Sequence, residues 1–150
     1  MEVEGSGQRT PADALAIILK GADLILDALV GYSLRGAPRE PVAGFIRAAN
    51  AAPVFRLSLD LPSGLDSDSG LPSEPTVRAQ ATLTLAWPKA GLLARPARPF
   101  VGDLYVADIS VPEAVYRAVG VSRGSLFAGG PIVRVVPVGG AWQAIYDYTP

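Results

Sequence analysis

The chain has 150 residues, of which 49% are hydrophobic and 18% charged, as expected for one globular domain with a core. It contains no cysteine and no histidine, which excludes disulfides, thiolate nucleophiles, histidine bases and zinc sites of the usual ligand types. The net charge of −1 argues against general binding to nucleic acid, and Asp and Lys interrupt the longest apolar stretches, so we expect no membrane span.

The chain starts with an acidic, polar segment, residues 1–9, which is unlike a signal peptide. We expect a flexible leader and a cytoplasmic protein. Thr10 and Pro11 are typical of a helix start, with Asp13 placed to favour the helix dipole. A domain over residues 10–137 follows, and then a tail over 138–150 without a motif, whose aromatic residues we expect to pack back on the domain.

Apolar runs and turn residues predict the elements of this domain. In chain order they are a helix over 12–22, a strand over 23–30, a loop over 31–38, a helix over 39–52, a strand over 53–60, a loop over 61–76, strands over 81–87 and 102–109, a helix over 112–119 and a strand over 131–138. Helices that alternate with short apolar strands favour an α/β fold, with a parallel sheet and helices on both faces.

Two aspartates carry the main functional signal, because ligands of such sheets bind beyond the carboxyl ends of the strands. Asp27 lies towards the end of the first predicted strand and Asp60 ends the second, and a glycine-containing loop follows each strand. Asp60 is interpreted either as part of a strand-ending turn or as a carboxylate in a crevice. In a crevice it could act as a general base, hold a ribose hydroxyl or help to hold a hard cation.

Three other features near these strand ends are open to two interpretations. Arg35 could grip a phosphate, although its loop has neither the P-loop nor the GxGxxG spacing. Lys89, which follows the third strand, could face the same crevice or lie on the surface. Residues 66–70, DSDSG, are better interpreted as a solvated turn than as a calcium loop, since no glutamate follows at the EF-hand spacing.

Four segments in order resemble the YjeF N-terminal domain family of NAD(P)H-hydrate epimerases: DLILDALVGYSLRGAPREP, LDLPSGLDSDSG, VRAQATLTLAWPKAGLL and GDLYVADISVP. The resemblance covers about residues 12–137, and GYSLRGAPREP is similar to the apolipoprotein A-I-binding protein branch. It implies a three-layer αβα Rossmann-like sandwich with a mostly parallel sheet. It also implies interconversion of the R and S forms of hydrated NADH or NADPH (NAD(P)HX), alongside a companion dehydratase.

The resemblance also implies roles for individual residues. Asp27 and Ser63 match positions that help to bind a potassium ion. Asp60 matches a substrate-contacting aspartate and, from its position, would be the acid–base residue, with Lys89 assisting at the same centre. The residues that match the nucleotide-contacting loop are Gly31, Tyr32, Ser33, Leu34, Arg35, Gly36 and Ala37.

One departure separates this chain from the family pattern. The family domain carries a glycine-rich NNGGDG loop in an earlier segment, and nothing like it precedes Asp27 here. We therefore expect an N-terminally truncated domain whose sheet lacks its opening strand. Three alternatives remain: an epimerase in a truncated or inactive form, a non-catalytic nucleotide-binding or dimerising scaffold, or a chain that folds only with a missing piece. A homodimer is expected.

Overall fold

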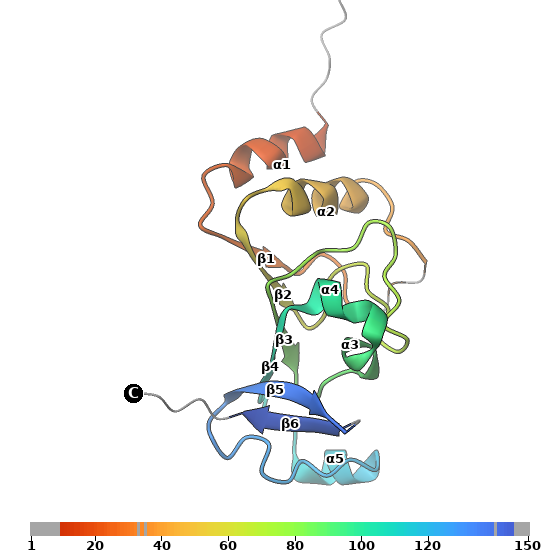
Figure 1. Cartoon of the computed structure of the whole chain (residues 1–150), viewed down its shortest axis with the longest axis vertical. Coiled ribbons are helices and arrows are strands. Elements are labelled where there is room, and N and C mark those ends of the chain that lie inside the picture. Colours follow the sequence, from red (N-terminus) through yellow and green to blue (C-terminus); the bar gives the residue numbers. More distant parts are fainter. Residues whose placement is uncertain (1–9, 33, 35, 140, 146–150) are drawn as a thin grey trace, which may run out of the picture.

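The computed structural model describes residues 10–32, 34, 36–139 and 141–145. They form one six-stranded sheet in which the strands lie side by side in chain order (Figure 1). The strands are β1 (Leu24–Asp27), β2 (Phe55–Leu59), β3 (Ala81–Leu85), β4 (Asp103–Ala107), β5 (Ile132–Val138) and β6 (Ala141–Ile145). The helices are α1 (Pro11–Leu19), α2 (Val42–Ala51), α3 (Ala90–Leu93), the 3₁₀ helix η1 (Arg95–Ala97), α4 (Arg98–Val101) and α5 (Glu113–Ala118). Within these described ranges no helix has the length and apolar character needed to cross a membrane.

The strand pairing confirms an α/β fold with a mostly parallel sheet. Strands β1 to β4 pair in parallel, β5 runs antiparallel to β4, and β6 runs antiparallel to β5. The sequence predicts no element after residue 138, yet β6 pairs with β5 from Val138↔Ala141 to Arg134↔Ile145. Strand β6 forms because it pairs with β5. The sequence of residues 141–145 alone does not reveal this pairing. Of the tail aromatics, Tyr146 and Tyr148 lie outside the described residues.

Helix α1 begins where the sequence indicates. Thr10 Oγ1 accepts a hydrogen bond from the Asp13 backbone N–H at 3.2 Å, and the Asp13 carboxylate accepts one from the Thr10 backbone N–H at 2.9 Å. This reciprocal pair is a capping box, which satisfies two backbone donors at the helix start. At the other end of α1, Leu19 packs with Ile25 and Ala49, so α1 is held against β1 and α2.

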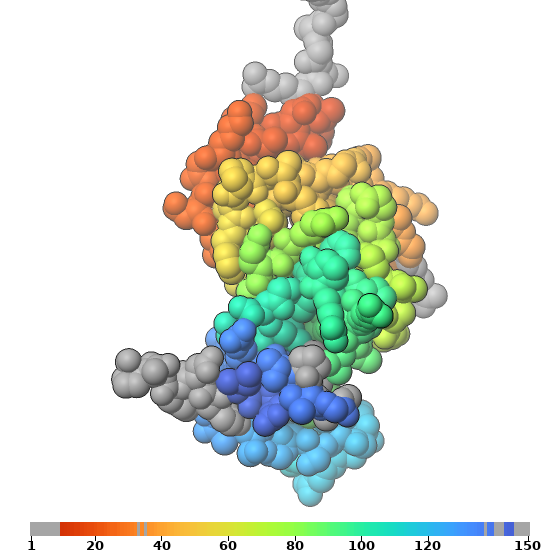
Figure 2. Space-filling view, in the orientation of Figure 1, coloured from red at the N-terminus to blue at the C-terminus, as the bar shows by residue number. Residues whose placement is uncertain are grey.

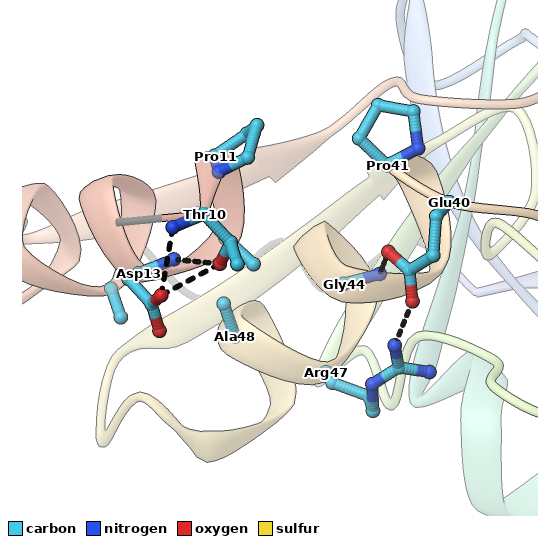
Figure 3. Close-up of a pocket in the computed structure, with 10 residues that line it drawn as sticks. Thr10, Pro11, Asp13, Glu40, Pro41, Gly44, Arg47 and Ala48 are labelled. Atoms are coloured by element: carbon cyan, nitrogen blue, oxygen red, sulfur yellow. Dashed lines mark hydrogen bonds and ion pairs between the residues drawn. The ribbon is translucent and has the colours of Figure 1, made fainter. Parts of the chain in front are cut away.

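Helices α1 and α2 lie against each other and leave a surface groove between them (Figure 3). They approach closely at Gly44, where an added Cβ would lie 2.9 Å from the Ala12 Cβ and 2.8 Å from Glu40 Oε2. Glu40 accepts a hydrogen bond from the Gly44 backbone N–H at 3.0 Å and forms an ion pair with Arg47. These polar contacts join α2 to the turn that precedes it. The groove between α1 and α2 is explained by the packing of the two helices.

The segment between β3 and β4 contains three short helices that the sequence analysis did not predict. A proline lies in the first turn of η1 and another in the first turn of α4, which is the part of a helix that tolerates proline. Leu92, Ala97 and Val101 of this segment are buried in the main core with Leu104 and Val106 of β4. Burial against the sheet, rather than helix propensity, therefore holds this segment in place.

The described helices leave one face of the parallel strands uncovered. In Figure 1, α2, α3 and α4 lie to one side of the sheet. On the opposite side, the side chains of Leu24, Leu26 and Phe55 are 52%, 57% and 49% exposed. Leu24 is paired with Phe55, and Leu26 with Leu57, so these residues share a surface that we call the open face. Parallel sheets normally have both faces covered, which makes this apolar surface unusual.

Residues 60–80, which connect β2 to β3, contain no helix and form the predicted long loop. Leu61, Leu65 and Val77 are buried, and the loop is fastened to the segment before β4 by the Gly91 N–H donating to the Ser67 carbonyl at 2.8 Å. Figure 2 shows the loop and helices α3 and α4 packed together. At Gly64 the backbone has φ +98°, and an added Cβ would lie 2.6 Å from the Pro75 carbonyl oxygen.

We predict that Gly64→Ala destabilises the protein far more than Gly120→Ala. Gly120 also has a positive φ, +75°, but nothing lies within 4 Å of its added Cβ. The left-handed conformation should cost Gly120→Ala about 1 kcal/mol, and the additional backbone clash should bring Gly64→Ala to about 3 kcal/mol or more. Urea unfolding measures both free energies, and equal losses would contradict the clash.

Candidate functional site

The carboxyl ends of the parallel strands bring the predicted site residues to one edge of the sheet. Asp27 is the last residue of β1, Asp60 follows β2 directly, and Lys89 lies four residues after β3. Asp27 is in register with Ser58 of β2, so the structure does place the ends of β1 and β2 together. Asp108, which follows β4 directly, lies at the same edge and was missed. It lay inside the strand predicted over 102–109, and only the observed end of β4 at Ala107 places it after a strand.

Asp27 is a buried carboxylate, 3% exposed, that accepts hydrogen bonds from two serines. Ser63 donates to it through its backbone N–H at 2.9 Å and its hydroxyl at 2.6 Å, and the Ser58 hydroxyl donates at 2.7 Å. No basic side chain in the described ranges pairs with Asp27. The carboxyl oxygens are therefore satisfied by hydrogen bonds, which tie β1, β2 and the loop after β2 into one unit.

The oxygens around Ser63 form a donor set that suits a hard cation. Ser63 Oγ lies 2.6 Å from Asp27 Oδ1 and 3.2 Å from the Val30 carbonyl oxygen, and it also accepts a hydrogen bond from the Val30 N–H at 2.9 Å. A carboxylate, a hydroxyl and a carbonyl are oxygen ligands with one negative charge among them, and this charge is not neutralised by a neighbouring cation. These residues fit a potassium ion in chemical type. The described residues contain no cluster of three or more Asp, Glu, His or Cys side chains that could hold a metal ion.

Asp60 adopts a strained backbone conformation at the end of β2. Its φ is +70°, its N–H donates to the Leu83 carbonyl at 2.8 Å, and the Leu61 N–H donates to the Leu59 carbonyl at 3.0 Å across it. Ala86 repeats this turn at the end of β3, with φ +62°. Non-glycine residues in this region of φ are uncommon and concentrate at functional sites. The turn aims the Asp60 carboxylate at β3, where the Leu85 N–H donates to Oδ1 at 3.2 Å.

Lys89 forms an ion pair with Asp60 Oδ1. It also donates to Thr84 Oγ1 at 3.1 Å and to the Leu85 carbonyl at 3.2 Å. Three acceptors match the three N–H bonds of a lysine ammonium. The side chains of Asp60 and Lys89 are 21% and 24% exposed, so a ligand can reach the pair. A carboxylate that is held in place and partly exposed can exchange a proton with a bound ligand.

The predicted nucleotide-contacting loop follows the end of β1, at the same edge of the sheet as the ends of β2 and β3. Gly31, Tyr32, Gly36 and Ala37 are exposed, Leu34 is half-buried, and Gly36 has φ +77°. Ser33 and Arg35, the residues of this loop best equipped to bind phosphate, lie outside the described residues. The nucleotide-binding role of the loop stays a prediction.

Two groups near the strand ends have shifted pKa values with clear causes. Burial, and then the charge of Asp108, raises the pKa of the Tyr116 phenol, which stays a neutral donor to the Ala86 carbonyl at 3.1 Å. The Ser69 hydroxyl, followed by the Ser69 and Asp68 backbone N–H groups, lowers the pKa of Asp66. Asp66 is exposed and its acceptors are used within its own turn, as a solvated turn requires.

Asp108 forms an ion pair with Arg123 at 2.6 Å and accepts a hydrogen bond from the Ser110 N–H at 2.8 Å. The guanidinium of Arg123 also lies over the Phe127 ring, 4.9 Å from its centroid. These contacts fasten the segment between β4 and β5 to the end of β4. Asp108 is thus a fixed structural charge at the edge of the site.

Comparison with known proteins finds relatives over most of this chain. An NAD(P)H-hydrate epimerase of Dehalogenimonas lykanthroporepellens is 50% identical over 115 residues, which are 76% of this chain and 45% of that protein. A bifunctional NAD(P)H-hydrate repair enzyme Nnr of Hyperthermus butylicus is 43% identical over 104 residues, 69% of this chain and 18% of the relative. The chain spans about half the length, or less, of these curated relatives.

The crystal structure of the yeast protein ynu0 superposes with a TM-score of 0.64 at 24% identity, over 79% of this chain and 50% of the yeast chain, and so shares its fold. A sequence model of the family described as YjeF-related protein N-terminus matches residues 3–91. The match includes Asp27, Asp60, Ser63 and Lys89, the residues that the fold gathers at the strand ends. The chain belongs to the family of the YjeF-related protein N-terminus.

Proposed function

We propose that this chain is an NAD(P)H-hydrate epimerase domain, which interconverts the R and S forms of NADHX or NADPHX. The observation that carries the proposal is the partly exposed Asp60–Lys89 pair, which lies at the carboxyl ends of parallel strands beside the predicted nucleotide loop. Relatives that are themselves named NAD(P)H-hydrate epimerases support it.

Epimerisation of NAD(P)HX requires a group that can both take and give a proton at the hydroxyl of the hydrated nicotinamide carbon. Exchange by ring opening needs a base to take the hydroxyl proton, and exchange by loss and return of water needs an acid to give one. In either route the proton must be returned before the product leaves. Asp60 can serve in both directions, and the Lys89 ammonium beside it holds the carboxylate in place.

Asp60→Asn should lower the rate of epimerisation about 100-fold or more, because the amide cannot carry the proton. Asp68→Asn is the matched control, since it makes the same substitution at an exposed loop position. Equilibration of S- and R-NADPHX, followed by chromatography, measures both rates. If wild type and Asp60→Asn both proceed at the rate of buffer alone, this chain is not an epimerase by itself.

We further propose that potassium binds at Asp27, Ser63 and the Val30 carbonyl. The buried carboxylate without a basic partner supports this proposal, since a bound cation would neutralise its charge. When bound, the ion would supply positive charge that orders the loops after β1 and β2. These are the loops that hold Asp60 and the predicted nucleotide contacts.

Potassium should therefore raise the melting temperature relative to lithium at equal ionic strength, because a ligand that binds only the folded state stabilises it. In Ser63→Ala the difference between the two salts should disappear. A Ser58→Ala variant, which removes a partner of Asp27 on the strand side, should keep the difference. Equal melting temperatures of the wild-type protein in the two salts would contradict the site.

The partner proposals follow from the same family. We propose a functional pairing with an NAD(P)HX dehydratase in the cytoplasm, supported by relatives named bifunctional NAD(P)H-hydrate repair enzymes.

A second candidate function, a dimerising scaffold, is favoured by the open face. There, leucine and phenylalanine residues that are about half exposed lie in two neighbouring strands. A second copy of this chain is the occupant that we propose for that face, since burial of apolar surface drives association.

Leu26→Lys, in the middle of the open face, should convert a dimer of the wild-type chain to a monomer. The charge would have to be buried in the interface without a partner. Val119→Lys, at a position that is 69% exposed and away from this face, should leave the dimer intact. Light scattering gives the mass of each variant, and a monomeric wild-type chain at high concentration would overturn the proposal.

A further inference from the structure

Thr84 is a buried polar residue whose hydroxyl the sequence analysis did not single out. It lies on β3 with its side chain fully buried, and it faces the same side of the sheet as Ser58 and Asp27. Its hydroxyl lies 3.1 Å from Lys89 Nζ and 3.4 Å from Asp60 Oδ1. The hydroxyl can therefore accept from the ammonium and donate to the carboxylate at the same time.

These contacts are concentrated on one oxygen of the Asp60 carboxylate. Oδ1 receives the Lys89 ammonium, the Leu85 N–H and the Thr84 hydroxyl. No donor from the described residues lies within hydrogen-bond distance of Oδ2, while the side chain as a whole is 21% exposed. One oxygen is thus held by protein groups, and the other remains available to a ligand.

We propose that Thr84 is a positioning residue: it holds the Lys89 ammonium on Asp60 Oδ1 and so leaves Oδ2 for the proton exchange with substrate. The inference rests on the proposed epimerase function for its catalytic consequence, but the placement of Lys89 can be tested without turnover. Removal of the hydroxyl leaves the ammonium with one acceptor fewer and frees it to leave the carboxylate. Thr84 acts through Lys89 and Asp60 and does not itself touch substrate.

The chain offers a matched control on the same strand. Thr82 has the same side chain and is also fully buried, but its hydroxyl donates to the Val101 carbonyl at 2.7 Å and serves packing between β3 and α4. Thr82→Val and Thr84→Val therefore make the same chemical change at equal burial. Only Thr84→Val removes a contact to Lys89. Thr84→Ser keeps the hydroxyl and tests for rescue.

The placement of Lys89 can be measured by competitive acetylation of the full chain and mass spectrometry. The only lysines are Lys20 and Lys89, and Lys20 is exposed at the end of α1, so it serves as an internal standard. In Thr84→Val the Lys89-to-Lys20 labelling ratio should rise about tenfold, in line with the loss of one hydrogen bond to a charged group. Thr84→Ser and Thr82→Val should keep the wild-type ratio. An unchanged ratio in Thr84→Val, or an equal rise in Thr82→Val, overturns the placement.

The catalytic arm uses the same variants with S/R-NADPHX. In Thr84→Val, kcat should fall about tenfold while KM changes less than twofold, because the hydroxyl orients the reacting carboxylate and does not bind substrate. Thr84→Ser should restore kcat, and Thr82→Val should keep it. If the wild-type chain has no activity, the epimerase proposal fails while the labelling ratio still decides the placement of Lys89. An active wild type with unchanged kcat in Thr84→Val overturns the positioning role.

Discussion

The buried carboxylate of Asp27 is the contact on which the arrangement at the strand ends depends. Ser58 donates to it from β2, and Ser63 donates to it from the loop that follows β2. A carboxyl group that is 3% exposed needs hydrogen-bond partners from the protein, so these segments are held in one relative position. The loop that follows Asp60 is thereby anchored at Ser63, three residues beyond it.

A second constraint is the strained turn at Asp60. Its backbone adopts a positive φ because the N–H bonds to the Leu83 carbonyl and the carboxylate accepts the Leu85 N–H, both on β3. The strand that supplies these partners also carries Thr84, and the turn after it leads to Lys89. Asp60 is thus positioned by its neighbouring strand as much as by its own. The strain in the turn is compensated by hydrogen bonds that a relaxed conformation would lose.

The sheet itself is unequally covered. The core lies between the sheet and the segments that carry Leu61, Leu92 and Val101, whereas the open face presents Leu24, Leu26 and Phe55 to solvent. The site does not lie on that face, because Asp27, Ser58 and Thr84 all point to the covered side. The contacts that hold these site residues in place therefore lie on the covered side of the sheet. The apolar open face is a separate feature of the molecule.

Much of this molecule follows from local sequence pattern. The apolar runs predict the five strands that end or begin at turn residues, Thr10 and Pro11 predict the start of α1, and the aspartates that follow two strands predict the edge where the site lies. Strand β6 and the short helices before β4 could not be predicted, because each depends on a partner surface: β5 for the strand, and the core around Leu104 for the helices. Asp108 lay inside the strand predicted over 102–109, so its place at the same edge depends on where β4 ends in the structure.

The sequence by itself determined the family and the α/β class, and it singled out Asp27, Asp60, Ser63 and Lys89 as site candidates, since short motifs need no knowledge of distant contacts. Only the tertiary structure decided that Ser58 and Thr84 belong with them. Both are ordinary serine and threonine residues within apolar strands. What places them at the site is the register between neighbouring parallel strands, and that register is set by contacts between segments far apart in the chain.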